Sequence, residues 1–201
     1  MNRNLLLLET IRLEDGVFHN LSYHQRRVQA SSLELWGCPV MWNLGESIWI
    51  PENKRKDLYK VRVVYGPDTF KPQILPYTIR DISSLKLVFG DHIDYGLKYE
   101  DRSEINTLFD KRGDCDEILI IRDGLITDTS YANVVLFDGE KWYTPKYPLL
   151  PGTRREKLLH QGKILEADIR PQDLDDFLEL RIINAMIDMD HSPSIPVSTI
   201  Q

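Results

Sequence analysis

The sequence predicts an α+β fold in two parts, and three observations favour it. Two short strands flank Asp15-Gly16, a dipeptide that supplies the positive φ angles of a tight hairpin turn. Residues 60–66 (KVRVVYG) alternate charged and β-branched side chains, which is the period of a half-buried strand. Strand-forming runs then dominate the second half of the chain. We therefore expect a small α+β domain over residues 1–82 and a larger β-rich domain over residues 83–201.

One helix is predicted in the N-terminal part. Asn20 or Ser22 can cap its start, and Ser22 with Gln25 has the spacing of a capping box. The helix should run to about Trp36, because Gly37 can adopt the left-handed conformation that ends many helices.

The C-terminal part predicts a meander of strands, with Asp-Gly hairpin turns at 123–124 and 138–139. The predicted strands after residue 70 are 71–79, 85–89, 117–121, 125–127, 132–137, 141–144 and 180–184. The predicted helices are 102–112, 153–162 and 172–178. Thr153 and Glu156 have the spacing of a second capping box at the start of the middle helix.

Composition argues against several classes of partner. The chain has 25 Lys and Arg against 31 Asp and Glu, a formal charge of −6, whereas nucleic-acid binding needs clustered basic residues. The most apolar short run, 5–8, ends at Glu9 and is far shorter than a bilayer span. Cys38 and Cys115 are expected to be free thiols of a reducing compartment. We expect a cytoplasmic protein with no nucleic-acid partner, no membrane partner and no metal site.

Standard catalytic motifs are absent from the sequence, which has no G-x-G-x-x-G, P-loop, G-x-S-x-G or H-E-x-x-H. The helix start at Gly152-Thr153 does offer backbone N–H groups and the positive end of a helix dipole, an arrangement that binds phosphate. Most capped helices bind nothing, so this feature alone does not define a function.

Several sequence blocks occur in a recognisable order. They are ETIRLEDG (9–16), YHQRRV (23–28), KVRVVYG (60–66), GLKYEDRSEIN (96–106), DEILIIRDGLITDTSYANVVLF (116–137), YTPKYPLLPGTRREKLL (143–159) and INA (183–185). Together they resemble the class IV aminotransferase family, the enzymes of fold type IV that use pyridoxal 5'-phosphate (PLP). The resemblance implies a two-domain, D-amino acid aminotransferase-like fold, a homodimer, and PLP bound in the cleft between the domains.

Position by position, Lys98 matches the family's Schiff-base lysine, whose amine needs a pKa lowered by burial or cationic neighbours. Asp128 stands where the family has a glutamate that pairs with the pyridine nitrogen. Aspartate is one methylene shorter, so the ring would lie closer or a water would bridge. Asn133 is expected to have a structural role, holding the start of the strand that follows Asp128. The alternative interpretation is a solvated lysine and a turn-forming aspartate.

The resemblance also implies a set of phosphate contacts. Arg27 matches the arginine of an H-x-x-R block and lies three residues after His24, on one face of the predicted helix. A guanidinium can hold a phosphate through two parallel hydrogen bonds. The other implied phosphate contacts are Gly152, Thr153, Asn184 and Ala185.

For activity, the LKYEDR and INA blocks look more like those of 4-amino-4-deoxychorismate lyases, which form 4-aminobenzoate and pyruvate from a small amino substrate. An aminotransferase acting on a D- or branched-chain amino acid is the alternative, and a binding module without catalysis is a third hypothesis. Arg62, Arg80 and Arg102 are all candidates for the substrate carboxylate. Family members usually have a further stretch before the ETIR block, so we expect one edge of the small domain's sheet to be exposed or covered by a partner subunit.

Overall fold

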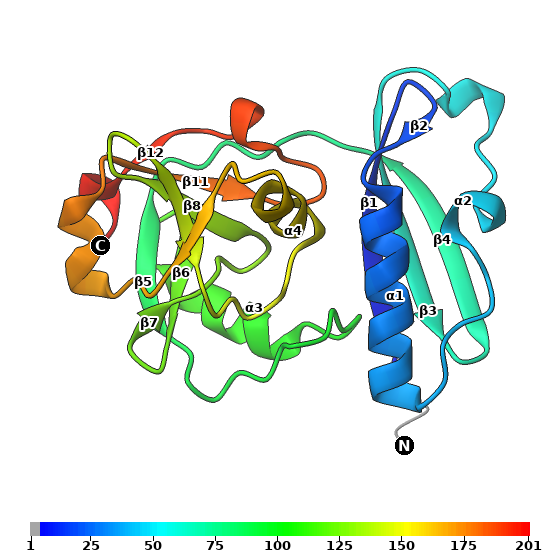
Figure 1. Ribbon diagram of the computed structural model, residues 1–201, viewed down its shortest axis with the longest axis horizontal. Helices are drawn as coiled ribbons and strands as arrows, with labels where there is room; N and C mark the ends of the chain where they lie inside the picture. The colour runs from blue at the N-terminus through cyan, green and yellow to red at the C-terminus, as the bar shows by residue number, and fades with distance from the viewer. Residues whose placement is uncertain (1–4) are drawn as a thin grey trace. The chain divides into compact units, whose positions relative to one another are not determined.

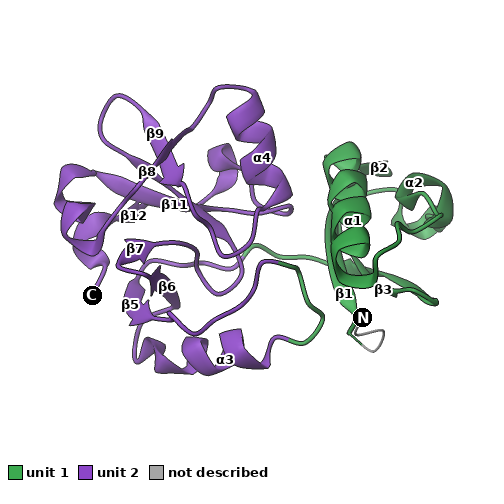
Figure 2. Ribbon diagram, turned by 60° about the horizontal axis from the view of Figure 1, so that its bottom comes forward, with its two compact units in different colours: residues 1–79, 97–101 green, residues 80–96, 102–201 purple. Residues whose placement is uncertain are grey.

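A computed structural model describes residues 5–201 (Figure 1), and the chain divides into two compact units (Figure 2). Unit 1 extends to Ile79 and also contains Leu97–Asp101, whereas unit 2 comprises Arg80–Gly96 and Arg102–Gln201. Lys98 therefore lies in unit 1, and not in the C-terminal part where the sequence analysis placed it.

Unit 1 is a four-stranded antiparallel sheet with one long helix. Its elements are β1 (Leu7–Glu14), β2 (Val17–Phe18), α1 (Leu21–Trp36), α2 (Leu44–Ser47), β3 (Leu58–Gly66) and β4 (Thr69–Pro76), and the strand order is β2-β1-β3-β4. Asp15 and Gly16 have φ angles of 48° and 77°, which confirms the predicted hairpin turn. Leu7, Ile11 and Leu13 of β1 belong to the core that α1 also lines.

The two ends of α1 differ in how well the sequence predicted them. Asn20 precedes the helix without a side-chain capping bond, and Ser22 lies inside the first turn, so the predicted capping box is wrong. The Gln25 side chain instead accepts a hydrogen bond from the N–H of Leu44, outside the helix. Gly37 ends the helix with a φ of 72°, as predicted.

The segment that contains Lys98 pairs with the edge of β1. The N–H of Leu8 donates to the Lys98 carbonyl at 2.8 Å, and the N–H of Glu100 donates to the Leu6 carbonyl at 2.9 Å. This part of the β1 edge is covered by the chain itself, so the exposed or partner-covered edge that the sequence predicts does not lie here. The opposite edge is β4, where Pro72 interrupts the row of N–H donors.

Unit 2 contains two sheets. Its elements are β5 (Leu85–Phe89), α3 (Ser103–Phe109), β6 (Glu117–Arg122), β7 (Leu125–Ile126), β8 (Asn133–Phe137), β9 (Trp142–Pro145), α4 (Thr153–His160), β10 (Leu165–Ala167), β11 (Glu179–Ile183) and β12 (Ile195–Pro196). The strand orders are β5-β6-β7 and β10-β9-β8-β11-β12. The helix predicted over 172–178 is a 3-10 helix over Pro171–Asp176.

The predicted single meander is wrong, because its two hairpins fall in different sheets. Asp123 and Gly124 have φ angles of 52° and 75°, which confirms the first hairpin turn. Thr127 and Asp128 continue to hydrogen-bond to Ile120 in β6, after which the chain enters β8 of the second sheet. Asp128 therefore lies where the chain passes from one sheet of unit 2 to the other.

Two further observations concern residues 5–201 as a whole. No helix in this range combines the length and the apolar character that crossing a bilayer requires. Both cysteines are free thiols, Cys115 buried and Cys38 exposed.

Candidate active site

Unit 1 buries a carboxylate, a guanidinium and an imidazole against one another. Glu9 of β1 is fully buried and shares its face of the strand with Leu7 and Ile11. Arg27 of α1 donates from Nε to Oε1 of Glu9 and from Nη2 to Oε2, at 2.7 Å each. Nδ1 of His24 lies 2.6 Å from the same Oε2. The predicted common face of His24 and Arg27 is confirmed, and it is directed at Glu9.

The charges of this cluster determine its protonation. Burial would raise the pKa of Glu9, but the guanidinium of Arg27, together with His24, lowers that pKa to about 2. Burial lowers the pKa of His24; Glu9 opposes this shift, whereas the positive charges of Arg27 and Lys98 add to it. At neutral pH the cluster is therefore a Glu9–Arg27 ion pair beside a neutral imidazole.

Two of the predicted site residues, Lys98 and Arg27, come together in unit 1. Both act on the pKa of His24, and charges act this way only over short distances. Lys98 is held in the segment that pairs with β1, the strand that carries Glu9. The predicted catalytic lysine and the predicted phosphate-binding arginine therefore belong to the same unit, and the positive charge of each lowers the pKa of His24.

In unit 2, Asp128 ties the start of β8 to the loop before α4. Its Oδ1 accepts a hydrogen bond from Nδ2 of Asn133 at 2.8 Å, and its Oδ2 accepts one from the N–H of Leu150 at 2.9 Å. Burial raises the pKa of Asp128 to about 6, against these two hydrogen bonds and the charge of Arg155, which lower it. Asn133 also donates to the carbonyl of Leu150, so it has the structural role predicted for it.

The helix start at Gly152 depends on the same network. A Cβ atom on Gly152 would lie 2.0 Å from Oδ1 of Asn133, so the close approach requires glycine although its φ is −74°. Gly152 is also the N-cap residue of α4, and Thr153 is the first residue of the helix. The predicted capping box of Thr153 and Glu156 is wrong, because the capping position is one residue earlier and carries no side chain.

Asn184 and Ala185 form a turn directly after β11. The Asn184 side-chain oxygen accepts a hydrogen bond from the N–H of Met186 at 2.8 Å. The preceding residue, Ile183, pairs with Asn133 at the start of β8. This turn therefore lies beside the start of β8, where Asn133 binds the Asp128 carboxylate, and the predicted site residues of unit 2 lie together there.

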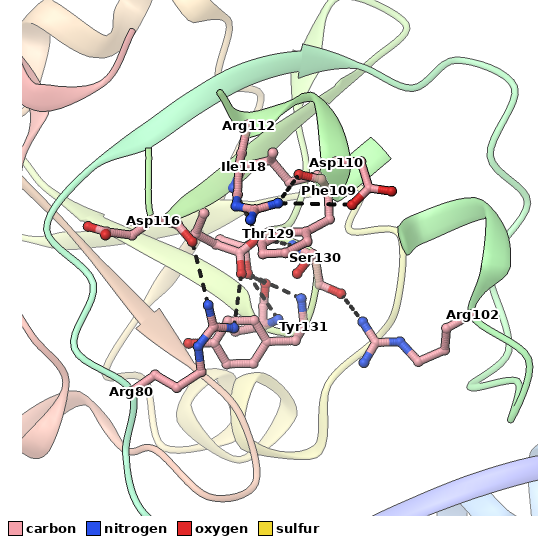
Figure 3. Close-up of polar contacts among 12 residues, drawn as sticks. Arg80, Arg102, Phe109, Asp110, Arg112, Asp116, Ile118, Thr129, Ser130 and Tyr131 are labelled. Carbon is pink, nitrogen blue, oxygen red and sulfur yellow. Dashed lines mark hydrogen bonds and ion pairs between the residues drawn. The ribbon is translucent and has the colours of Figure 1, made fainter. Parts of the chain in front are cut away.

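Two arginines hold the chain just after Asp128 (Figure 3). Arg102 donates from Nη2 to the carbonyl of Ser130, and the Arg80 guanidinium lies 5.3 Å from the centroid of the Tyr131 ring. Arg80 also lies 3.6 Å from the buried carboxylate of Glu117, whose Oε1 accepts a hydrogen bond from the N–H of Ser130. Both arginines contact protein groups of unit 2. Arg62, the third candidate for the substrate carboxylate, forms an ion pair with Glu100 at 2.6 Å in unit 1.

Sequence reasoning missed Glu9 and Glu117 as members of these networks. A signal for Glu9 was present, because it occupies an inward position of an alternating strand between Leu7 and Ile11. Glu117 opens the apolar run of β6 and is fully buried there. A charged residue at a core position is buried only when it is paired, and each of these carboxylates is hydrogen-bonded.

Comparisons with known proteins assign this structure to a family. Residues 99–191 match the sequence model described as amino-transferase class IV. The chain is 38% identical to a Haemophilus somnus protein of known structure, with a TM-score of 0.84, over 91% of this chain and 97% of that chain. That protein is described as a candidate 4-amino-4-deoxychorismate lyase. The chain belongs to the class IV aminotransferase family.

Two further proteins are similar to this chain over most of its length. A Haemophilus influenzae protein described as uncharacterized is 43% identical over 182 residues, 90% of this chain and 97% of that protein. The PLP-bound structure of a hypothetical aminotransferase from Mycobacterium tuberculosis is 17% identical, with a TM-score of 0.71, over 98% of this chain and 81% of that chain. At this identity the likeness shows the fold alone. Class IV aminotransferases are PLP-dependent, and this chain is a PLP-dependent enzyme with their mixed α/β fold.

Proposed function

We propose that this class IV enzyme is a 4-amino-4-deoxychorismate lyase, which forms 4-aminobenzoate and pyruvate by β-elimination. The observation that carries the proposal is the 38% identity to the Haemophilus somnus protein described as a candidate lyase, over nearly all of that chain. Structures described as candidate aminotransferases, from Mesorhizobium loti and Thermotoga maritima, are 21% and 18% identical. The elimination divides the atoms of one substrate between two products, so it requires neither an oxidant nor an amino-group acceptor.

The donor and acceptor groups of unit 2 fit the cofactor. Asp128 accepts hydrogen bonds from Asn133 and from the N–H groups of Leu150 and Leu149, and a carboxylate has about four acceptor positions, so capacity for one more donor remains. The N-terminus of α4, which begins at Thr153 after the N-cap residue Gly152, presents backbone N–H groups and the positive end of the helix dipole, which suits a phosphate. We assign Asp128 to the pyridine nitrogen and assign the phosphate to Arg27, Gly152, Thr153, Asn184 and Ala185.

When bound, PLP supplies an electron sink for the reaction. Asp128 has a pKa of about 6, so at neutral pH it is ionised and can hold a proton on the pyridine nitrogen. Lys98 would hold the cofactor through its side-chain amine, and its Nζ would be the base that accepts the proton from the substrate's α-carbon. Arg27, whose guanidinium is paired with Glu9, would contribute a positive charge to the binding of the phosphate.

A product assay tests this proposal. The PLP-loaded enzyme is incubated with 4-amino-4-deoxychorismate, with and without an added 2-oxo acid. We expect equal amounts of 4-aminobenzoate and pyruvate in both incubations. Turnover that requires the 2-oxo acid and converts it to an amino acid would identify an aminotransferase instead, and that result would overturn the lyase proposal.

A further inference from the structure

Glu9 is a fully buried charge of unit 1 that the proposed chemistry does not use directly. It occupies a core position of β1, on the face that Leu7 and Ile11 share, and its side chain is fully buried. The side chain of Arg27, which pairs with Glu9, is 14% exposed. A ligand of unit 1 can therefore reach Arg27, whereas it cannot contact the buried Glu9.

The contact between Glu9 and Arg27 is of the kind that sets an orientation. The guanidinium is planar, and Glu9 accepts from both Nε and Nη2 at 2.7 Å, which is a bidentate pair. Such a pair fixes the plane of the guanidinium and the direction of its other N–H groups. An arginine without such a pair would lose more side-chain entropy on binding a ligand.

His24 completes this arrangement from the same helix face. Its Nδ1 lies 2.6 Å from Oε2 of Glu9, so the carboxylate is held between two side chains of α1. Burial lowers the pKa of His24, and its ring is neutral at neutral pH. The ionised Glu9 is therefore balanced by Arg27, and the three groups have a net charge of zero before any anion binds.

We propose that Glu9 is a positioning residue for the cofactor phosphate: it holds the Arg27 guanidinium in its binding orientation, and His24 holds Glu9. The inference rests on the proposed assignment of Arg27 to the PLP phosphate. A purely electrostatic role predicts the opposite effect of neutralising Glu9, because Arg27 would then attract the phosphate more strongly. The sign of the change in affinity therefore distinguishes positioning from charge balance.

The test measures dissociation constants of PLP and of pyridoxal, which lacks the phosphate, for the wild type and four variants. Glu9→Gln keeps the shape of the side chain and removes its charge. Glu9→Asp keeps the charge but is one methylene shorter, so the carboxylate lies farther from Arg27. Arg27→Gln removes the guanidinium. Glu14→Gln is the matched control, because Glu14 forms a bidentate pair with Arg12 on the same strand, at 3.1 and 2.9 Å. The fourth variant combines Glu9→Gln with Arg27→Gln.

We expect Glu9→Gln to weaken PLP binding about tenfold, the effect of losing one hydrogen bond to a charged group, with little change for pyridoxal. In the Arg27→Gln background the same substitution should have no further effect, and Glu14→Gln should bind PLP as the wild type does. Glu9→Asp should also weaken PLP binding, and it serves as the test if Glu9→Gln fails to fold.

Unchanged or tighter PLP binding by both Glu9 variants would overturn the inference. Equal losses for PLP and pyridoxal, or a full additional loss in the Arg27→Gln background, would overturn it as well, because Glu9 would then act on stability alone. Failure of the lyase proposal is distinguishable, since it appears in the product assay and leaves these affinities unchanged. A wild-type protein that binds no PLP would contradict the cofactor assignment itself and the inference with it.

Discussion

Gly152→Ala provides a direct test of the network around Asp128. The added Cβ would lie 2.0 Å from Oδ1 of Asn133, closer than any real contact, so one of the two must move. Asn133 cannot move freely, because its Nδ2 donates to Asp128 at 2.8 Å and to the Leu150 carbonyl at 2.9 Å. Losing the bond to the carboxylate costs about 1.5–3 kcal/mol, and overpacking costs a further ~1–3 kcal/mol.

The backbone of Gly152 has a φ of −74°, so alanine adds no conformational strain there. By reducing the conformational entropy of the unfolded chain, alanine stabilises the fold by less than about 1 kcal/mol. The expected net loss is about 3 kcal/mol, which corresponds to a fall in Tm of roughly 6–12 °C for a chain of this size. Thermal unfolding followed by circular dichroism measures it. Gly96→Ala is the matched control in the same unit, because a Cβ at Gly96 would meet nothing within 4 Å.

A double variant identifies the cause. Asn133→Ala removes the atom that the new Cβ would meet, so Gly152→Ala should cost little further stability in that background. The reasoning is refuted if Gly152→Ala is no more destabilising than Gly96→Ala, or if its cost is the same with and without the Asn133 side chain.

The remaining predictions concern pH, activity and assembly. The pKa of Asp128 is about 6 in the folded state, above its ordinary value of 3.8, so the protein loses stability as the pH rises from about 4 to about 6. Over this range the free energy of unfolding of the wild type should fall by about 3 kcal/mol relative to that of Asp128→Asn. Denaturant titrations at each pH measure this difference. The pH dependence due to Glu9 has the opposite direction, because its pKa is lowered to about 2. Glu9 should stabilise the fold by about 3 kcal/mol above about pH 4.5, and this stabilisation should be lost as the pH falls toward 2. The variant Glu9→Gln should not show this loss. Asp128→Asn should also reduce turnover far more than it weakens PLP binding, and equal losses in both would refute its assignment to the ring nitrogen. Light scattering should report a homodimer, and a monomer at assay concentration would contradict that expectation.

Local turn chemistry was the part of the fold that the sequence predicted best. The Asp-Gly turns at 15–16 and 123–124 have positive φ at both residues, because this property belongs to the dipeptide itself. Capping was predicted poorly, since Gln25, the expected partner in the first box, is used by the distant backbone of Leu44. The assignment of the two later hairpins to different sheets could not be predicted, because it depends on the pairing of β8 with β11, some 45 residues further along the chain.

The candidate site shows the same division between local and long-range information. The common face of His24 and Arg27 follows from helical spacing, and it was predicted. Their shared partner Glu9 lies 15 and 18 residues earlier, on a different element, so spacing alone could not indicate the contact. The membership of Lys98 in unit 1 depends on a backbone pairing with Leu8, about ninety residues away in the sequence, for which no local pattern exists.

Borohydride reduction of the PLP-loaded protein tests most directly whether this chain performs PLP chemistry through Lys98. Reduction fixes the cofactor to the amine that carries it, and peptide mapping by mass spectrometry then locates the pyridoxyl group. We predict a yellow protein that is bleached by borohydride, with the pyridoxyl group on Lys98 and with no labelled peptide from Lys98→Ala. A pyridoxyl group on another lysine, or no modified peptide from protein that has taken up PLP, would contradict the account.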